Sequence, residues 1–264
     1  MMSGYDAGAE EFDRHRGLPA DAANLVRAAV IGFLAPAARP RLLDLGAGGG
    51  RVGWPFANAG DDYVGLDLSL GMLQAFARRV EPQKGAGVRL VQADGARLPF
   101  RDASFDAVML VQVFGGLSGW RRVLEEARRV SRPPGVLIVG RVVRPEDGVD
   151  ARMKAHLTSI LDRFGIESRP RNRRGDARGW LASAARLDRR AIAAEWNAER
   201  TPRAFLERQP TGAQFAGMPP AVREASLREL GEWAAATFGS LDAASSERHA
   251  FELEFFTFDN RRQD

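Results

Sequence analysis

The 264-residue chain contains no cysteine and only three histidines, His15, His156 and His249. Without cysteine it can form no disulfide, no thiolate nucleophile and no thiolate zinc site. The histidines are too widely separated in the sequence to form a metal-binding motif. The sequence therefore predicts neither a metal site nor thiol chemistry.

Long hydrophobic runs are also absent. No apolar stretch approaches the roughly 20 residues that a membrane-spanning helix needs, and the chain does not start with a basic segment followed by an apolar one, the pattern of a secretory signal. Hydrophobic residues still make up 45% of the chain, enough to fill a large core. We expect a globular, cytoplasmic protein, monomeric or homodimeric, that has no membrane partner.

Lysine is scarce as well: only Lys84 and Lys154 occur, so arginine supplies nearly all of the positive charge behind the net charge of +4. The arginines concentrate in residues 169–178, a run without the interleaved aromatic side chains of a stacking platform for single-stranded nucleic acid. We interpret this run as a solvated loop. The alternative interpretation is a segment that binds an anionic substrate or RNA. Nucleic acid is not the expected partner.

The most informative segment present is a glycine-rich turn after the apolar run at residues 42–45. The turn follows the pattern D-x-G-x-G-x-G over residues 44–50, which predicts a buried strand, a loop that brings backbone N–H groups close to a ligand, and a helix whose positive dipole end faces that ligand. The dinucleotide pattern G-x-G-x-x-G also fits residues 48–53, but it starts too late in the turn. An ordinary glycine-rich turn remains the alternative.

Two further apolar runs end in acids. The stretches 63–69 and 88–96 predict the second and third strands, and their acids are Asp67 and Asp94. A carboxylate at the end of the strand beside the first can accept hydrogen bonds from both hydroxyls of a ribose. The alternative is that Asp67 only caps the following helix, for which Ser69 is also a suitable cap.

Residues 40–143 as a whole resemble the class I S-adenosylmethionine-dependent methyltransferases of the type 11 or UbiE-like superfamily. The resemblance rests on the glycine-rich turn, on the acids after the next two strands, and on the Leu-Pro-Phe and Ser-Phe-Asp steps at residues 98–106. Two departures occur: residues 133–135 are Pro-Pro-Gly where the family has Pro-Gly-Gly, and Gln112 stands where many relatives have a histidine.

The resemblance implies S-adenosyl-L-methionine as the cofactor. Its amino-acid end would be held by the residues of the glycine-rich turn, Asp44, Gly46, Ala47, Gly48 and Gly50, with Arg16 as a candidate partner of the carboxylate. Asp67 would hold the ribose, and Leu68 or Met72 would pack on the adenine. Asp94, Gly95 and Ala96 would contact the adenine edge, and Val111 would lie at the end of the fourth strand. For Arg16 the alternative is a surface arginine near the terminus.

The same pattern predicts an α/β fold: a doubly wound, mostly parallel seven-stranded sheet with an antiparallel last strand and a helical lid. We expect residues 1–39 to form an N-terminal lid and first helix, residues 40–200 and 249–259 the Rossmann-like core, and residues 201–248 a helical insertion that roofs the active site.

The C-terminal half is less informative. It predicts helices over 151–164, 179–187 and 222–238, a fifth strand over 136–140, a sixth over 191–196, and a closing strand over 251–255 at the edge of the sheet. Its tryptophans, Trp180, Trp196 and Trp233, either line a substrate pocket or belong to the core, and aromatic residues on amphipathic helices are more often core.

The leading functional prediction is direct transfer of the sulfonium methyl group to a small-molecule acceptor, with the protein acting mainly by alignment. No general base is identified; His15, His156 and Gln112 are the polar candidates, although glutamine is not a base. The alternatives are an RNA or protein methyltransferase that uses residues 169–178, a cofactor-binding protein without catalytic activity, and, more remotely, a dehydrogenase.

Overall fold

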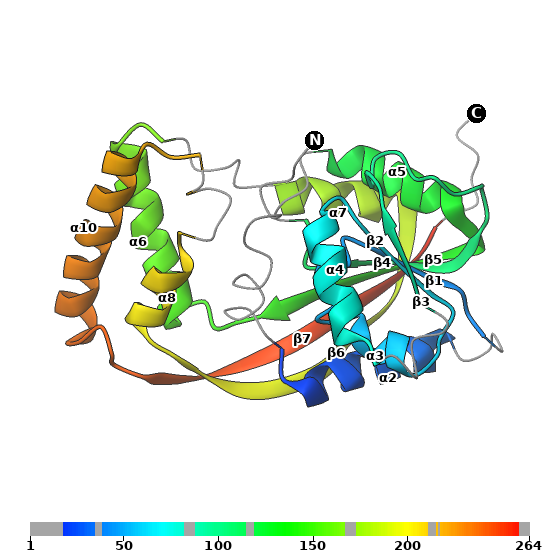
Figure 1. The fold of residues 1–264 in the computed structure, drawn as a ribbon, viewed down its shortest axis with the longest axis horizontal. Coiled ribbons are helices and arrows are strands. Elements are labelled where there is room, and N and C mark those ends of the chain that lie inside the picture. Colours follow the sequence, from blue (N-terminus) through cyan, green and yellow to red (C-terminus); the bar gives the residue numbers. More distant parts are fainter. Residues whose placement is uncertain are drawn as a thin grey trace.

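The computed structural model describes residues 18–34, 39–81, 88–114, 119–166, 173–210, 215 and 217–258. Its centre is a seven-stranded sheet of order β3-β2-β1-β4-β5-β7-β6 (Figure 1). The strands are β1 (Leu42–Leu45), β2 (Tyr63–Asp67), β3 (Val88–Gln92), β4 (Phe105–Val111), β5 (Ser131–Val143), β6 (Ala185–Arg200) and β7 (Ser245–Phe258). The first five are parallel, and β7 is antiparallel to both neighbours, which confirms the predicted fold class.

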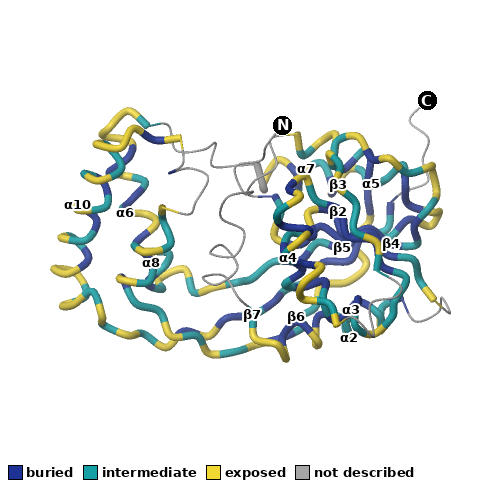
Figure 2. The backbone as a smooth tube through the Cα atoms, in the orientation of Figure 1, coloured by how far each residue is buried: buried dark blue, intermediate teal, exposed yellow. Residues whose placement is uncertain are grey.

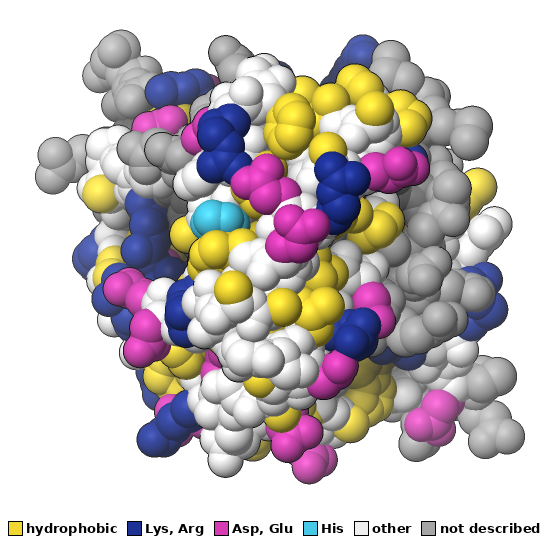
Figure 3. Space-filling view, turned by 90° about the vertical axis from the view of Figure 1, so that its left-hand side faces the viewer, with side chains coloured by type: hydrophobic (Ala, Val, Ile, Leu, Met, Phe, Trp, Pro, Cys, Tyr) yellow, Lys and Arg dark blue, Asp and Glu magenta, His cyan; other side chains and the backbone are white. Residues whose placement is uncertain are grey.

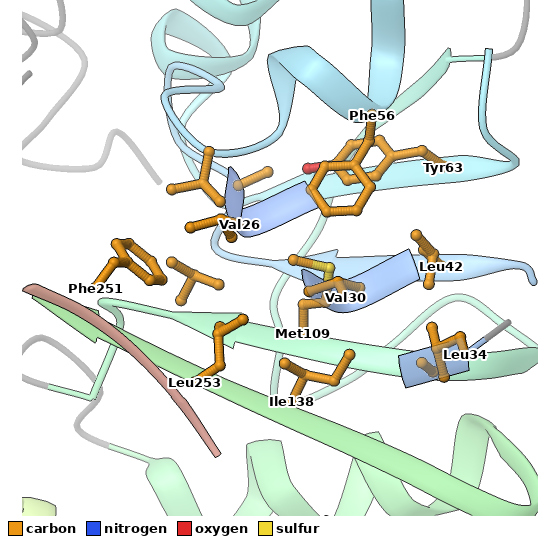
Figure 4. Packing of buried hydrophobic residues seen from close by; sticks show 14 of the residues in the cluster. Val26, Val30, Leu34, Leu42, Phe56, Tyr63, Met109, Ile138, Phe251 and Leu253 are labelled. Carbon is orange, nitrogen blue, oxygen red and sulfur yellow. The ribbon is translucent and has the colours of Figure 1, made fainter. Parts of the chain in front are cut away.

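Helices cover both faces of the sheet. They are α2 (Ala20–Leu34), α3 (Trp54–Asn58), α4 (Leu70–Arg79), α5 (Trp120–Val130), α6 (Val149–Arg163), α7 (Arg173–Ala184), α8 (Pro202–Arg208) and α10 (Pro220–Phe238). Val26, Val30 and Leu34 of α2 pack with Phe56 of α3 on side chains from the central strands (Figure 4). On the other face, α5 and α7 pack on alternate side chains of the same strands. The result is a doubly wound layer structure.

Local sequence accounts for several boundaries. All four residues of β1 are buried, as expected for a central parallel strand. Ser69 caps α4, because its Oγ accepts a hydrogen bond from the Met72 N–H at 3.2 Å. Thr201 caps α8 in the same way, with Pro202 in the first turn. The Ser69 cap was predicted from the sequence.

Three helices, α6, α8 and α10, form a separate helical lobe with its own apolar core. The lobe lies beyond the end towards which β5 runs, and the outer halves of β6 and β7 extend from the sheet to reach it (Figure 1). This two-stranded ribbon is less buried than the centre of the sheet (Figure 2). The expected insertion at residues 201–248 contains α8 and α10, but α6 belongs to the same packing unit.

Several predicted strand positions were wrong. β7 is not the edge strand, because it lies between β5 and β6 and the edge is β6. β6 is far longer than residues 191–196: backbone pairing with β7 holds it along its whole length, so it needs no apolar alternation. β5 starts at Ser131 rather than after residues 131–135, because Pro133 and Pro134 lie where the pairing of β4 and β5 shifts register and their missing N–H groups are not needed.

The second helix of the C-terminal half was also misplaced. It spans Arg173–Ala184 rather than residues 179–187, and Leu187 lies in β6. Within the described ranges, no helix combines the length and the apolar character needed to cross a membrane.

Candidate active site

The glycine loop, residues 46–50, leaves β1 at the carboxyl edge of the sheet. Its Gly46 and Ala47 N–H groups both donate to the carbonyl oxygen of Leu66, at 2.8 and 3.0 Å, so the loop is tied to the end of β2. Gly46, Gly48 and Gly50 all have positive φ, at 79°, 54° and 76°. Such angles strain any residue with a Cβ, which is why the chain needs glycine at these positions.

The surroundings of the three glycines differ. A Cβ on Gly46 would lie 2.4 Å from Cγ1 of Val113, and a Cβ on Gly50 would lie 2.2 Å from the Phe76 ring. Above Gly48, the nearest atom would be 4.0 Å away. Gly48 therefore faces open space, whereas the other two glycines are required by packing.

The helix that follows the loop is short and does not begin directly after it. α3 has only five residues and begins at Trp54, four residues after Gly50. Because the dipole effect needs a helix terminus within about one turn of the charge, the backbone of the loop, rather than a helix dipole, is the feature that can hold a ligand.

Asp44 lies one residue inside β1 and is 2% exposed. Its Oδ2 accepts a hydrogen bond of 2.5 Å from the Tyr63 hydroxyl on β2, while its Oδ1 is buried and has no hydrogen-bond partner in the protein. Burial raises the pKa of Asp44 to about 6, against the opposing effect of the Tyr63 hydrogen bond. Burying an unpaired carboxylate oxygen is costly. The atom is therefore suited to accept a hydrogen bond from a ligand.

Asp67 joins the glycine loop to the end of β2. Its Oδ2 accepts from the Gly48 N–H and its Oδ1 from the Ser69 N–H, both at 2.9 Å. The cap of α4 is Ser69, so Asp67 is not the helix cap that the alternative required. These two bonds fix the orientation of the carboxylate.

The third acid follows β3. Asp94 is exposed, and its Oδ1 accepts from the Ala96 N–H at 2.8 Å, which closes a tight turn over Gly95. The Ala93 N–H donates to the carbonyl oxygen of Asp67 at 3.1 Å. This bond ties the start of the turn to the end of β2.

Apolar side chains complete this edge. Leu68 is 53% exposed, whereas Met72 is 5% exposed and packed beneath, so of the two only Leu68 offers surface to a ligand. Val111 ends β4 and is buried. The order β3-β2-β1-β4 therefore places Asp94, Asp67, the glycine loop and Val111 along one edge, as the sequence predicted.

The family profile of the methyltransferase domain matches residues 43–139, from β1 into β5. Residues 43–139 form a methyltransferase domain. Its curated relatives include the demethylmenaquinone methyltransferase of Renibacterium salmoninarum, 39% identical over 108 residues that make up 41% of this chain and 44% of that protein. The corresponding protein of Clavibacter sepedonicus is 35% identical over 142 residues, 52% and 57% of the two chains. The chain spans about half the length of the curated relatives it matches.

Solved structures show the same fold. A protein from Bacillus halodurans superposes with a TM-score of 0.58 at 19% identity, covering 87% of this chain and 97% of that one. The YcgJ protein of Bacillus subtilis gives 0.53 at 19% identity, covering 87% and 98%. These likenesses support the class I fold of the methyltransferase domain, and the resemblance drawn from the sequence is confirmed.

Two predicted features outside the methyltransferase domain lie wholly or partly beyond the described residues. Arg16 is one, and residues 169–172 of the arginine-rich run are the other. Residues 173–178 belong to α7 rather than to a loop, and Arg178 is ion-paired with both oxygens of Glu254 at 2.8 Å. Basic, acidic and hydrophobic side chains are interspersed on the outer face of the helical lobe (Figure 3). None of these observations favours RNA as a partner of the methyltransferase domain.

The tryptophans have different surroundings. Trp180 lines an open depression of about 540 Å³ between α5 and α7, together with Trp120, Arg121, Asp176, Gly179 and Ser183. Trp196 lies edge-on to His249, with ring centroids 5.8 Å apart, and Trp233 stacks on His156 at 4.1 Å. Of the three tryptophans singled out from the sequence, Trp180 is the one that lines this depression.

Sequence reasoning missed a buried acid–histidine pair beside the helical lobe. Glu247 Oε1 accepts from the Val149 N–H at the start of α6, at 2.7 Å, and its Oε2 lies 3.2 Å from His249 Nε2. His249 Nδ1 is buried and has no partner. The signal was the spacing of two residues, which places both side chains on one face of a strand. It was overlooked because the strand was predicted to begin at residue 251.

Gln112 follows β4 directly and is exposed. Its φ is 57°, an uncommon backbone conformation for a residue with a side chain. Among the described residues, no cluster of three or more His, Asp or Glu side chains could hold a metal ion.

Proposed function

We propose that the protein is an S-adenosylmethionine-dependent methyltransferase with a small-molecule acceptor. The observation that carries the proposal is the arrangement of Asp94, Asp67 and Asp44 along one sheet edge around a glycine loop that faces open space at Gly48. Three carboxylates beside an open glycine loop are suited to a ligand rich in hydroxyl and amino donors, and adenosylmethionine is such a ligand.

The residues present fit this cofactor. The glycine loop, Ala47 included, and the unpaired Oδ1 of Asp44 suit its ammonium-bearing end, and Asp67 suits the ribose hydroxyls. The exposed side chain of Leu68 suits one face of the adenine, with Asp94, Gly95 and Ala96 at its edge. Val111 lies where β4 ends. Arg16 stays a prediction for the cofactor carboxylate.

Methyl transfer requires little of the protein beyond alignment of the donor and the acceptor. When bound, the cofactor supplies a methyl group already activated by a positive sulfur. The chain then has to hold donor and acceptor in line and keep water away, and such orientation alone can supply several kcal/mol of the barrier reduction, on the order of 7–11 in favourable cases. No covalent enzyme intermediate is required.

The acceptor is proposed from the relatives and from the fold. The curated relatives are named for a quinone precursor, demethylmenaquinone, which is a small molecule. The helical lobe stands at the end of the molecule towards which β5 runs, which is also the end where the cofactor edge of the sheet lies (Figure 1). A lobe on that side suits contact with a small-molecule acceptor.

Calorimetric titration of the full chain with S-adenosylhomocysteine tests the cofactor. We expect a dissociation constant on the order of micromolar, a common range for enzyme ligands. Titration with NADH is the matched control and should give no heat. Absence of heat with S-adenosylhomocysteine, or binding of NADH instead, overturns the proposal.

Transfer of a radiolabelled methyl group tests the acceptor class. Incubation with a small-molecule metabolite extract should label material that passes an ultrafiltration membrane that retains protein and RNA. Label found only in added RNA, with binding that weakens steeply as salt is raised, would favour the RNA alternative. Label in no fraction, despite cofactor binding, would favour a protein without catalytic activity.

A further inference from the structure

The β3–β4 loop, residues 93–104, carries the acid that is proposed to contact the adenine, but little of the loop is buried. Leu98 is its only buried residue, and Asp94 is exposed. β3 is an edge strand with no fully buried side chain, so it provides little anchorage. Backbone hydrogen bonds of Ala93 and Ser104 hold the two ends of the loop, and Leu98 is its buried point between them.

Leu98 is held by two charged side chains of α5. Its N–H donates to Glu126 Oε2 at 2.8 Å, and its carbonyl oxygen accepts from Arg129 Nη2 at 3.1 Å. Both backbone polar groups of the one buried loop residue are thus bound by a pair three residues apart on one helix.

The pair is itself well ordered. Arg129 donates to Glu126 through Nε at 2.8 Å and through Nη2 at 2.7 Å, a bidentate geometry. Its Nη1 reaches further along the loop, to the Phe100 carbonyl oxygen at 2.8 Å and to Asp102 Oδ1 at 2.7 Å. One guanidinium therefore fixes three points of the loop.

Electrostatics favour the charged form of both groups. Glu126 is 5% exposed, and the hydrogen bonds from Arg129 outweigh its burial, so its pKa is lowered. The pKa of Arg129 is raised, first by Glu126 and then by Asp102. Val123, one turn earlier on α5, lies under Gly95, where an added Cβ would stand 3.7 Å from it. α5 therefore lies directly beneath the loop at both Gly95 and Leu98.

We propose that Glu126 and Arg129 are positioning residues for the adenine end of the methyl donor, acting through Leu98 to hold the turn that carries Asp94. The inference rests on the proposed cofactor. It goes beyond it in assigning cofactor selectivity to an ion pair on α5 that touches no part of the ligand.

The test compares Arg129→Met, Arg129→Lys and Glu126→Gln with two controls on the same helix, Arg121→Met and Glu125→Gln. The Arg121 side chain is exposed and lies over the Trp120 ring, and Glu125 is partly exposed and paired with Arg122. For each protein, calorimetry gives the affinity for S-adenosylhomocysteine and for S-inosylhomocysteine, in which a carbonyl oxygen replaces the adenine amino group. Hydrogen exchange of residues 93–100 is measured without ligand.

We expect Arg129→Met to weaken S-adenosylhomocysteine binding by about tenfold or more, because small misplacements of a positioning group are costly. The affinity for the inosine analogue should change much less, so the preference for adenine shrinks, and exchange of residues 93–100 should accelerate. Arg129→Lys and Glu126→Gln, which keep part of the hydrogen bonding, should give intermediate values and serve if Arg129→Met does not fold. The controls should match the wild type.

Equal weakening for both ligands, or unchanged adenine preference, would overturn the inference, because the pair would then contribute only to stability. Unchanged exchange of residues 93–100 would do so independently of any ligand. Failure of the wild-type protein to bind S-adenosylhomocysteine would instead overturn the proposed function, and the exchange data would still decide whether the pair holds the loop.

Discussion

Tyr63 donates a 2.5 Å hydrogen bond to Asp44 across β1 and β2, and both side chains are buried. The second oxygen of Asp44 has no partner in the protein, and the pKa of Asp44 is raised to about 6, chiefly by burial. The ligand-free protein therefore carries an incompletely satisfied acid at the base of its glycine loop.

Replacing this acid with its amide should stabilise the ligand-free protein at neutral pH. Between pH 4 and 6 the unfolded chain releases the Asp44 proton while the folded chain retains it, so wild-type stability falls as pH rises through this range. Asp44→Asn should thus exceed the wild type by about 1–3 kcal/mol at pH 7 and match it near pH 4. Urea unfolding at both pH values checks this, and an equal difference at both would contradict it. Cofactor affinity should fall.

The glycines of the loop should respond differently to alanine. Gly50→Ala should destabilise the fold by about 1–3 kcal/mol through overpacking, because the new Cβ would collide with the Phe76 ring. Gly48→Ala should cost only the left-handed backbone strain, about 1–2 kcal/mol, yet lose cofactor binding because its methyl enters open space proposed for the ligand. Thermal unfolding and calorimetry separate the two effects. Retained affinity in Gly48→Ala would argue against a ligand above this residue.

Asp67→Ala should weaken cofactor binding by about 1.5–3 kcal/mol, because ribose hydroxyls lose a charged acceptor and the Gly48 N–H loses its partner. Asp62→Ala is the control, since Asp62 precedes β2 at the end opposite Asp67 and is ion-paired with Arg89 and Arg41. Calorimetry with S-adenosylhomocysteine is the measurement. Similar losses in both variants would show that loss of a negative charge, rather than of the ribose contact, lowers the affinity.

The inner half of the sheet could be predicted from the sequence, and the outer half could not. Parallel core strands such as β1 and β2 are apolar except for an acid at or near their carboxyl ends, so the local sequence records both their position and these acids. β6 is mostly exposed and is held by backbone pairing with β7, which leaves no hydrophobic pattern to detect. The central position of β7 results from that pairing.

The same distinction applies to the candidate site. The acids at strand ends were visible as motifs, but their partners come from distant segments. Tyr63 is 19 residues from Asp44, and Leu98 is 28 residues from Glu126. No local pattern shows that these groups meet, because the crossovers of the fold bring them together. Only the spacing of Glu126 and Arg129 on one helical face was available in the sequence.

A buried carboxylate connects α7 to the sheet. Glu254 on β7 is 3% exposed and accepts hydrogen bonds from Arg178 of α7 and Arg190 of β6. Arg178→Met should lower stability by about 1–3 kcal/mol, since it removes a charge-assisted partner of a buried acid. Arg190→Met should cost less, because Arg190 is more exposed and Arg178 retains both contacts. Chemical unfolding ranks the two, and the reverse order would contradict this account.

His249 should make the protein sensitive to acid. Its pKa is lowered mainly by burial. The hydrogen bond with Glu247 raises the pKa, and the positive charges of Arg200 and Arg144 offset part of that increase. As pH falls below 6.5, the unfolded chain takes up a proton that the folded chain resists, so stability should fall. His249→Gln should flatten this slope between pH 7 and 5. His156→Gln, at a less buried histidine stacked on Trp233, is the control and should retain most of it. An unchanged slope in His249→Gln would exclude this histidine as its source.

The helical lobe is assembled from two stretches of chain that are far apart in sequence, α6 and the pair α8 and α10. Excising residues 201–248 alone would remove the packing partners of the apolar side chains of α6, among them Met153 and Ile160. An exchange of this lobe with that of a relative must therefore replace both stretches together, with the outer ribbon as the splice site. Variation in this lobe is thus constrained to occur in matched halves.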